Sequence, residues 1–231
     1  MISYVPFIVV LVFCVFHAQA ENYTEEIREE ELPSKVQQRN LIDTGRELCG
    51  LIRDVVSNEA RESESAVQKD VEMMISRARE IISLKQENFE LKHGSLTRKD
   101  IKSRAVLKTL PKLREEADAS LTECQSMVAD QTSIIANRIV EDAFGLEQKG
   151  QDIMNEFFEC SKKGSWSMFS CYKKTIGAKI FPLKDFLMDT VRAHSRAHTD
   201  FLTARNSAAN CIDKQLKEYE NKIESMYNSL G

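Results

Sequence analysis

Residues that end helices are scarce in this sequence, which has 4 prolines and 8 glycines among 231 residues. After the first twenty residues, the prolines are Pro33, Pro111 and Pro182. Alternation of apolar and polar residues, the pattern of a half-buried strand, is also absent. Because a sheet needs that alternation and frequent turn residues, the composition excludes a β-rich fold and favours long α-helices.

Long hydrophobic runs are missing too. The apolar stretch at residues 7–16 is too short for a membrane-spanning helix, which needs about 20 apolar residues. It lies in an N-terminal segment that has no Asp, Glu, Lys or Arg and ends in Ala18-Gln19-Ala20, the small-x-small pattern that signal peptidase cleaves. We therefore expect residues 1–20 to be a signal peptide and the mature chain to be secreted and extracellular, with no transmembrane segment.

Charge is the next constraint. The Glu-rich residues 21–33 are typical of a solvated acidic tail, and Asn22 begins a glycosylation sequon whose use stays open. The formal charge of −4 falls entirely on the mature chain, and we interpret acidic and basic residues as interspersed along it. That interpretation predicts no nucleic-acid partner and no anionic-membrane partner, because both favour a basic patch.

Apolar residues recur every three or four positions, as in amphipathic or coiled-coil helices. The pattern predicts a first helix over residues 34–91 and a second arm that Pro111 kinks or restarts. Residues 161–167 are the clearest reversal, and Pro182 suits the first turn of a last helix. We expect one all-α domain over residues 34–231: an elongated helical bundle or a long antiparallel helical hairpin with an additional N-terminal helix.

Five cysteines follow the predicted signal peptide: Cys49, Cys124, Cys160, Cys171 and Cys211. If the chain reverses near Gly164, antiparallel arms pair residues whose numbers have a nearly constant sum. Two pairs meet this condition to within about one helical turn, so we predict the disulfides Cys160–Cys171 and Cys124–Cys211. Cys49 is then a buried free thiol or the link in a dimer, unless the other four are paired differently.

Two histidines form a candidate pair of metal ligands. His194 and His198 are four residues apart and could share a zinc ion. Ser195 stands where the metalloprotease pattern has Glu, no third ligand is indicated, and two arginines lie nearby. We interpret the pair as part of a packed helix face and expect no metal site and no cofactor.

Catalytic motifs are absent from the sequence, so we expect no catalytic residue and no enzyme. The many carboxylates alternate with Lys and Arg, which is typical of solvated helix faces. Trp166, Phe169 and Tyr172 gather at the predicted reversal and form a candidate partner-binding tip. The favoured alternative is that they make a small cap core around Cys160 and Cys171.

The cysteine spacing on helices after a cleaved signal resembles the insect secreted proteins of the TsetseEP-type domain family. The resemblance rests on Cys124, the Cys160-x10-Cys171 pair and Cys211, and it covers residues 41–227. The Glu-Pro repeat tail of the founding member is missing, and Cys49 is extra. The resemblance implies an extracellular protein of gut, haemolymph or secretory epithelium, sometimes associated with immune or microbial challenge, with no assigned catalytic residue.

The expected function is therefore binding of an extracellular macromolecule whose identity the sequence does not give. The alternative is an extracellular carrier of lipid or another small apolar ligand. Amphipathic helices can part around such a ligand, and their Met, Leu and Phe side chains suit an adaptable pocket.

Non-reducing peptide mapping of the secreted protein tests these expectations together. We expect Glu21 as the N-terminal residue, two disulfides paired as above, and an alkylatable Cys49. A disulfide that includes Cys49 would refute the hairpin register from which the pairing was deduced.

Overall fold

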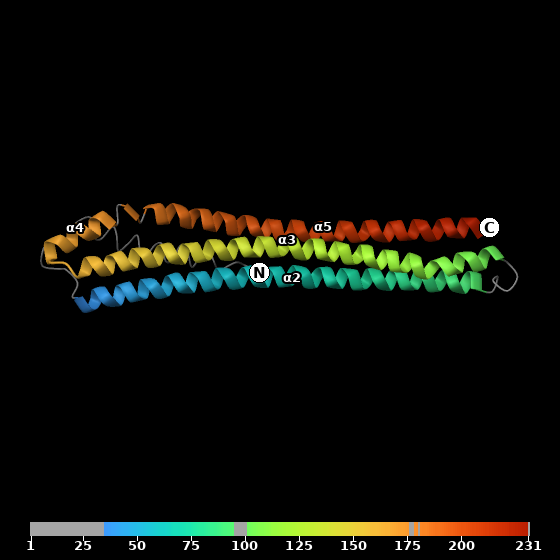
Figure 1. Cartoon of the computed structure of the whole chain (residues 1–231), viewed down its shortest axis with the longest axis horizontal. Helices are drawn as coiled ribbons and strands as arrows, with labels where there is room; N and C mark the ends of the chain where they lie inside the picture. The colour runs from blue at the N-terminus through green and yellow to red at the C-terminus, as the bar shows by residue number, and fades with distance from the viewer. Residues whose placement is uncertain (1–34, 95–100, 176–177, 180, 231) are drawn as a thin grey trace. The chain divides into compact units, whose positions relative to one another are not determined.

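The computed structural model describes residues 35–94, 101–175, 178–179 and 181–230. Its helices are α2 (Lys35–Gly94), α3 (Ile101–Ser161), α4 (Ser165–Thr175) and α5 (Phe181–Leu230), shown in Figure 1. No strand occurs within these ranges, so the predicted all-α class is confirmed. The signal peptide, the acidic tail and Asn22 lie outside the described residues.

The structure decides two points that the sequence left open. Helix α3 continues through Pro111, which is solvent-exposed, because Leu110 and Leu113 on either side of it are buried against the core. The predicted reversal is shorter than expected, since the chain turns only over residues 162–164 and helix α4 begins at Ser165. The second arm is therefore one helix that does not restart at Pro111, and a separate short helix, α4, follows the reversal.

The chain divides into two compact units, each built from segments of α2, α3 and α5. Among the described residues, unit 1 takes residues 35–62 and those within 136–198, and also contains α4. Unit 2 takes those within 63–135 and residues 199–230.

Unit 2 has a core of three apolar stripes whose members are three or four residues apart. Fully buried side chains include Ile75 and Ile82 on α2 and Leu121 and Val128 on α3. Full burial of each such side chain contributes about 1.5–3 kcal/mol. The disulfide Cys124–Cys211, with a Cα–Cα distance of 5.9 Å, joins α3 to α5 beside these residues. It is one of the two pairs that the sequence predicts.

Charged residues line the outer faces of unit 2 and pair between helices. Arg205 Nε lies 2.8 Å from Asp70 Oδ2, and Lys85 Nζ lies 2.8 Å from Glu220 Oε1. All four side chains are partly exposed, so each pair contributes at most about 1 kcal/mol. Within the described ranges, no helix has an apolar stretch long enough to cross a membrane.

Unit 1 brings α2 and α3 very close together where each supplies a small residue. A Cβ atom at Gly45 would lie 2.6 Å from Met154 Sδ, and a Cβ at Gly150 would overlap Cys49 Sγ. Neither glycine has a positive φ, so the close approach, rather than a special backbone conformation, requires them. Around these contacts lie Ile42, Ile153 and Met154, with Phe157, Phe158 and Leu183 partly buried against them.

Replacement of Gly150 by alanine tests this close packing. We expect Gly150→Ala to lower the free energy of unfolding by about 1–3 kcal/mol, because the new methyl group overlaps Cys49 Sγ. Chemical denaturation measures the change.

Gly50 provides the matched control on the same helix as Cys49. A Cβ there would meet only Glu147 Oε1, at 3.7 Å, so Gly50→Ala should stabilise by about 0.5–1 kcal/mol through helix propensity. The double variant C49A/G150A should recover most of the stability that G150A loses. Equal effects of alanine at 50 and at 150 would contradict the proposed contact.

Candidate functional site

The end of unit 1 where α3 turns into α4 is built by backbone hydrogen bonds and one disulfide. The N–H of Lys163 donates to the carbonyl of Cys160 at 3.1 Å, and the N–H of Met168 donates to the carbonyl of Gly164 at 2.8 Å. These bonds end α3 and start α4 with only three residues between them. We call residues 160–184 the tip.

A small apolar core supports the tip. The Cys160–Cys171 disulfide, with a Cα–Cα distance of 5.5 Å, ties the end of α3 to the middle of α4 and is the second pair that the sequence predicts. Cys160 and Met168 are buried, and the ring of Tyr172 packs edge-on against Phe157 with centroids 5.4 Å apart. Helix α4 is therefore held on the unit by its apolar side.

Positive charge is concentrated at the tip. The segment contains six lysines and no Asp, Glu or Arg; the lysines are Lys162, Lys163, Lys173, Lys174, Lys179 and Lys184. Because the whole chain carries −4 and this segment carries +6, the remaining residues together carry −10. Residues 160–184 are thus a basic stretch in an otherwise acidic chain.

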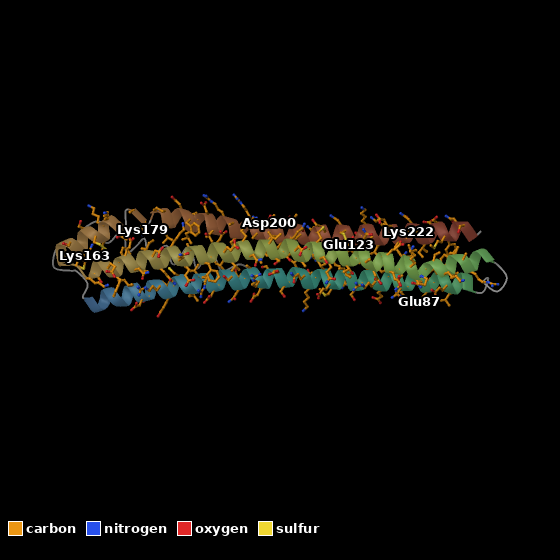
Figure 2. All side chains as sticks on the ribbon, in the orientation of Figure 1. Glu87, Glu123, Lys163, Lys179, Asp200 and Lys222 are labelled. Carbon is orange, nitrogen blue, oxygen red and sulfur yellow. A yellow bond between two sulfur atoms is a disulfide. The ribbon has the colours of Figure 1, made fainter. Side chains whose placement is uncertain are left out.

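Some of these lysines have acidic partners and others do not. Lys162 pairs with Glu159, three residues away, and Lys179 pairs with Glu156 on α3. Lys173 and Lys174 are exposed in the last turn of α4, and neither has an ion-pair partner among the described residues. Lys163 is exposed with its Nζ 3.3 Å from Cys171 Sγ. Figure 2 shows Lys163 and Lys179 at this end of the unit.

The aromatic residues predicted at the tip have different outcomes. Tyr172 is half-buried in the cap core around the disulfide, which is the alternative that the sequence favoured. The side chains of Trp166 and Phe169 lie outside the described part of the chain. The described contacts therefore support a packing role for Tyr172.

The histidine pair does not converge on a shared site. His194 Nε2 lies 3.3 Å from Glu59 Oε2 on α2, while His198 is exposed. His194 Nδ1 is buried and has no hydrogen-bond partner within the described part of the chain. Among the described residues, no group of three His, Cys, Asp or Glu side chains is placed to hold a metal ion. Only His194 therefore belongs to a packed helix face, where it joins α5 to α2, whereas His198 faces solvent.

Cys49 is half-buried and forms no disulfide with any other cysteine that the structure describes. Burial raises the pKa of its thiol, and the nearby Glu147 carboxylate raises that pKa further. A thiol kept neutral is a poor nucleophile and a slow partner in disulfide exchange. This environment favours the buried free thiol over the link in a dimer.

Unit 2 has a small groove on its surface. It lies between α3 and α5, and its lining includes Leu113, Ala117 and Tyr219, with the Glu116–Lys222 ion pair also present. The volume of this groove is about 50 Å³, whereas binding sites for small organic ligands have volumes of about 300–1,000 Å³. This groove is too small for an acyl chain.

Comparison with protein families matches residues 104–226 to the model of a family described as "Protein of unknown function (DUF725)". The match covers 123 of the 231 residues, slightly more than half of the chain. The chain belongs to the DUF725 family. The matched region includes the tip and all four disulfide-bonded cysteines but not Cys49. No curated protein and no solved structure matches the chain.

The basic tip of this DUF725 chain was missed in the sequence interpretation, which described the charges as interspersed. That description fits the long helices but fails for residues 160–184. The signal was available in the sequence as a 25-residue stretch with six basic and no acidic residues. The net charge of the whole chain does not reveal this stretch, because acidic residues in the rest of the chain outnumber the basic ones.

The reactivity of Cys49 tests its burial. We expect the native thiol to react with an aromatic disulfide reagent much more slowly than the thiol of the urea-unfolded chain, because less thiolate is present in the folded protein. A raised thiol pKa means that the folded state binds more protons than the unfolded state above about pH 8.5. Stability should therefore fall as the pH rises through that range.

The variant Cys49→Ala supplies the control for this pH dependence. Its free energy of unfolding should fall less steeply than that of the native chain above about pH 8.5. Identical slopes for the two proteins, or a native thiol as reactive as the unfolded one, would contradict the buried thiol.

Proposed function

We propose that this protein is a secreted, non-enzymatic binding protein that acts outside the cell through its basic tip. The proposal rests on the composition of residues 160–184, which contain six lysines and no acidic residue in a chain whose net charge is negative. A surface with an excess of positive charge attracts macromolecules of negative charge and speeds their encounter. The partner in this proposal is an anionic macromolecule.

The attachment of α4 to unit 1 supports the proposal. The Cys160–Cys171 disulfide and the packing of Met168 and Tyr172 hold α4 on unit 1. Lysines on a fixed helix lose less conformational freedom on binding than lysines on a flexible loop, so more of their attraction contributes to affinity.

An extracellular location is supported by two features. Residues 1–20 have the pattern of a signal peptide, and disulfides persist mainly in oxidising compartments. The resemblance to the insect TsetseEP-type domain family adds gut, haemolymph or secretory epithelium, with an immune or microbial context, as the proposed setting.

A binding panel tests the proposed function. The mature protein is immobilised and exposed to anionic phospholipid vesicles, a sulfated polysaccharide, single-stranded DNA and neutral vesicles at physiological salt. The same measurements are made on the variant K163E/K173E/K174E, which reverses the three exposed lysines without a described carboxylate partner. We expect binding to at least one anionic species and loss of that binding in the variant.

Two results would overturn the proposal. The first is that no anionic species binds, and the second is that the triple variant binds as well as the native chain. Native mass spectrometry of the secreted protein addresses the carrier alternative, because a stoichiometric lipid retained by the triple variant would favour a carrier over a tip-dependent binding protein.

A further inference from the structure

The face of α2 that points away from the core of unit 2 carries a second apolar stripe. In the described part of unit 2, seven large apolar side chains are exposed: four on α2 within residues 73–91, two on α3 and one on α5. The four on α2 are Met73, Ile81, Leu84 and Leu91. Single exposed apolar residues are common on protein surfaces, whereas a row of them marks an interaction surface.

The spacing of this stripe is that of a coiled-coil seam. The core residues Ile75, Ile82 and Phe89 are seven residues apart and almost fully buried. Positions two residues before and after each of them lie about 200° around the helix, on the opposite face. These positions follow one another in steps of four and three, as heptad contacts do. We call them the outer seam, and all six are exposed: Met73, Arg77, Glu80, Leu84, Glu87 and Leu91.

The described part of unit 2 leaves the outer seam uncovered. Leu84 is 51% exposed and Leu91 is 79% exposed. The three charged members of the seam have no ion-pair partner among the described residues, whereas Arg79 and Lys85 beside the seam pair with α3 and α5. Figure 2 shows Glu87 at the outer edge of α2. The seam is therefore free to contact another molecule.

The order of residues along the outer seam is complementary to itself in an antiparallel pair of helices. A two-fold axis level with Ile82 would place Met73 opposite Leu91 of a second copy. The same axis would place Arg77 opposite Glu87 of the second copy, with opposite charges facing one another. Each of these contacts occurs twice, because a two-fold axis repeats it.

The centre of this arrangement has no like charges facing one another. Leu84 would face the aliphatic stem of Glu80, and Ile81 would lie beside the axis next to its own copy. In a parallel pair each seam residue would face itself, so like charges would meet at Arg77, Glu80 and Glu87. Because like charges opposite one another disfavour an interface, the residues of the seam support the antiparallel arrangement.

We propose that this protein forms an antiparallel homodimer through the outer seam of α2. The dimer does not depend on the basic tip, and it does not use Cys49, which lies in unit 1. The seam extends over about 27 Å, so the interface is at the small end of specific interfaces. We therefore expect a reversible dimer with a dissociation constant in the micromolar range.

Sedimentation equilibrium of the mature protein, from low micromolar to several hundred micromolar, tests the proposal. We expect the native chain to pass from monomer to dimer over this range. L84E should weaken the dimer at least about tenfold, because it removes an apolar contact on both sides of the axis and puts a second carboxylate opposite Glu80. L202E makes the same substitution at an exposed leucine of α5 and should dimerise like the native chain. Both variants should keep the helical circular dichroism of the native chain, since both leucines are exposed.

Exchange of two charges tests the register. R77E and E87R should each weaken the dimer, because like charges then face one another across the axis. The double variant R77E/E87R has the net charge of the native chain and should recover the dimer, since opposite charges face one another again. A double variant as weak as the single ones would contradict the proposed axis.

Disulfide trapping tests the antiparallel direction. The variants C49A/M73C and C49A/L91C are oxidised separately and as a mixture. We expect a covalent dimer in the mixture and none with either variant alone. Two copies of residue 73 are about 27 Å apart in the proposed dimer, which is beyond the reach of a disulfide.

Three results would overturn the homodimer. They are a native chain that stays monomeric over the whole concentration range, equal weakening by L84E and L202E, and a covalent dimer of C49A/M73C with itself. A monomeric native chain whose outer seam is protected from hydrogen exchange only when another purified secreted protein is added would also overturn it and would assign the seam to that partner.

Discussion

Each long helix of this protein can bury its apolar residues only against other helices, because no sheet is present within the described ranges to cover them. In unit 2, stripes from α2, α3 and α5 meet around Ile75, Leu121 and Ala208. The members of each stripe are three or four residues apart, so a short segment would bury too little to be stable. The length of the helices is therefore tied to the number of core positions that they share.

Small residues set how close these helices come. In unit 1, Met154 packs against Gly45 and Cys49 packs against Gly150. The side chain of one helix thus fills the space that a glycine leaves on the other. This complementarity explains why glycines occur inside helices where propensity disfavours them. It also buries the thiol of Cys49, which keeps its pKa high and its reactivity low.

The tip combines two requirements that oppose one another. Six lysines within 25 residues repel each other, and this repulsion disfavours a compact arrangement of the segment. The Cys160–Cys171 disulfide and the contact of Tyr172 with Phe157 act in the opposite direction and hold α4 on the end of α3. In the chain-entropy model, a bridge closing so short a loop contributes about 3 kcal/mol. The disulfide and the apolar contact thus offset the repulsion between the lysines.

The sequence by itself determined the all-α class, the approximate extent of the long helices and the pairing of Cys124 with Cys211 and of Cys160 with Cys171. These features follow from helical periodicity and from chain reversal, which are local or nearly local properties. It also contained the basic tip, although the interpretation of interspersed charge passed over it. Only the tertiary structure decided that α3 runs through Pro111, that Cys49 packs on Gly150, and that Tyr172 faces Phe157. Those outcomes depend on which helix faces meet, and the pattern along a single helix does not specify the face of its neighbour.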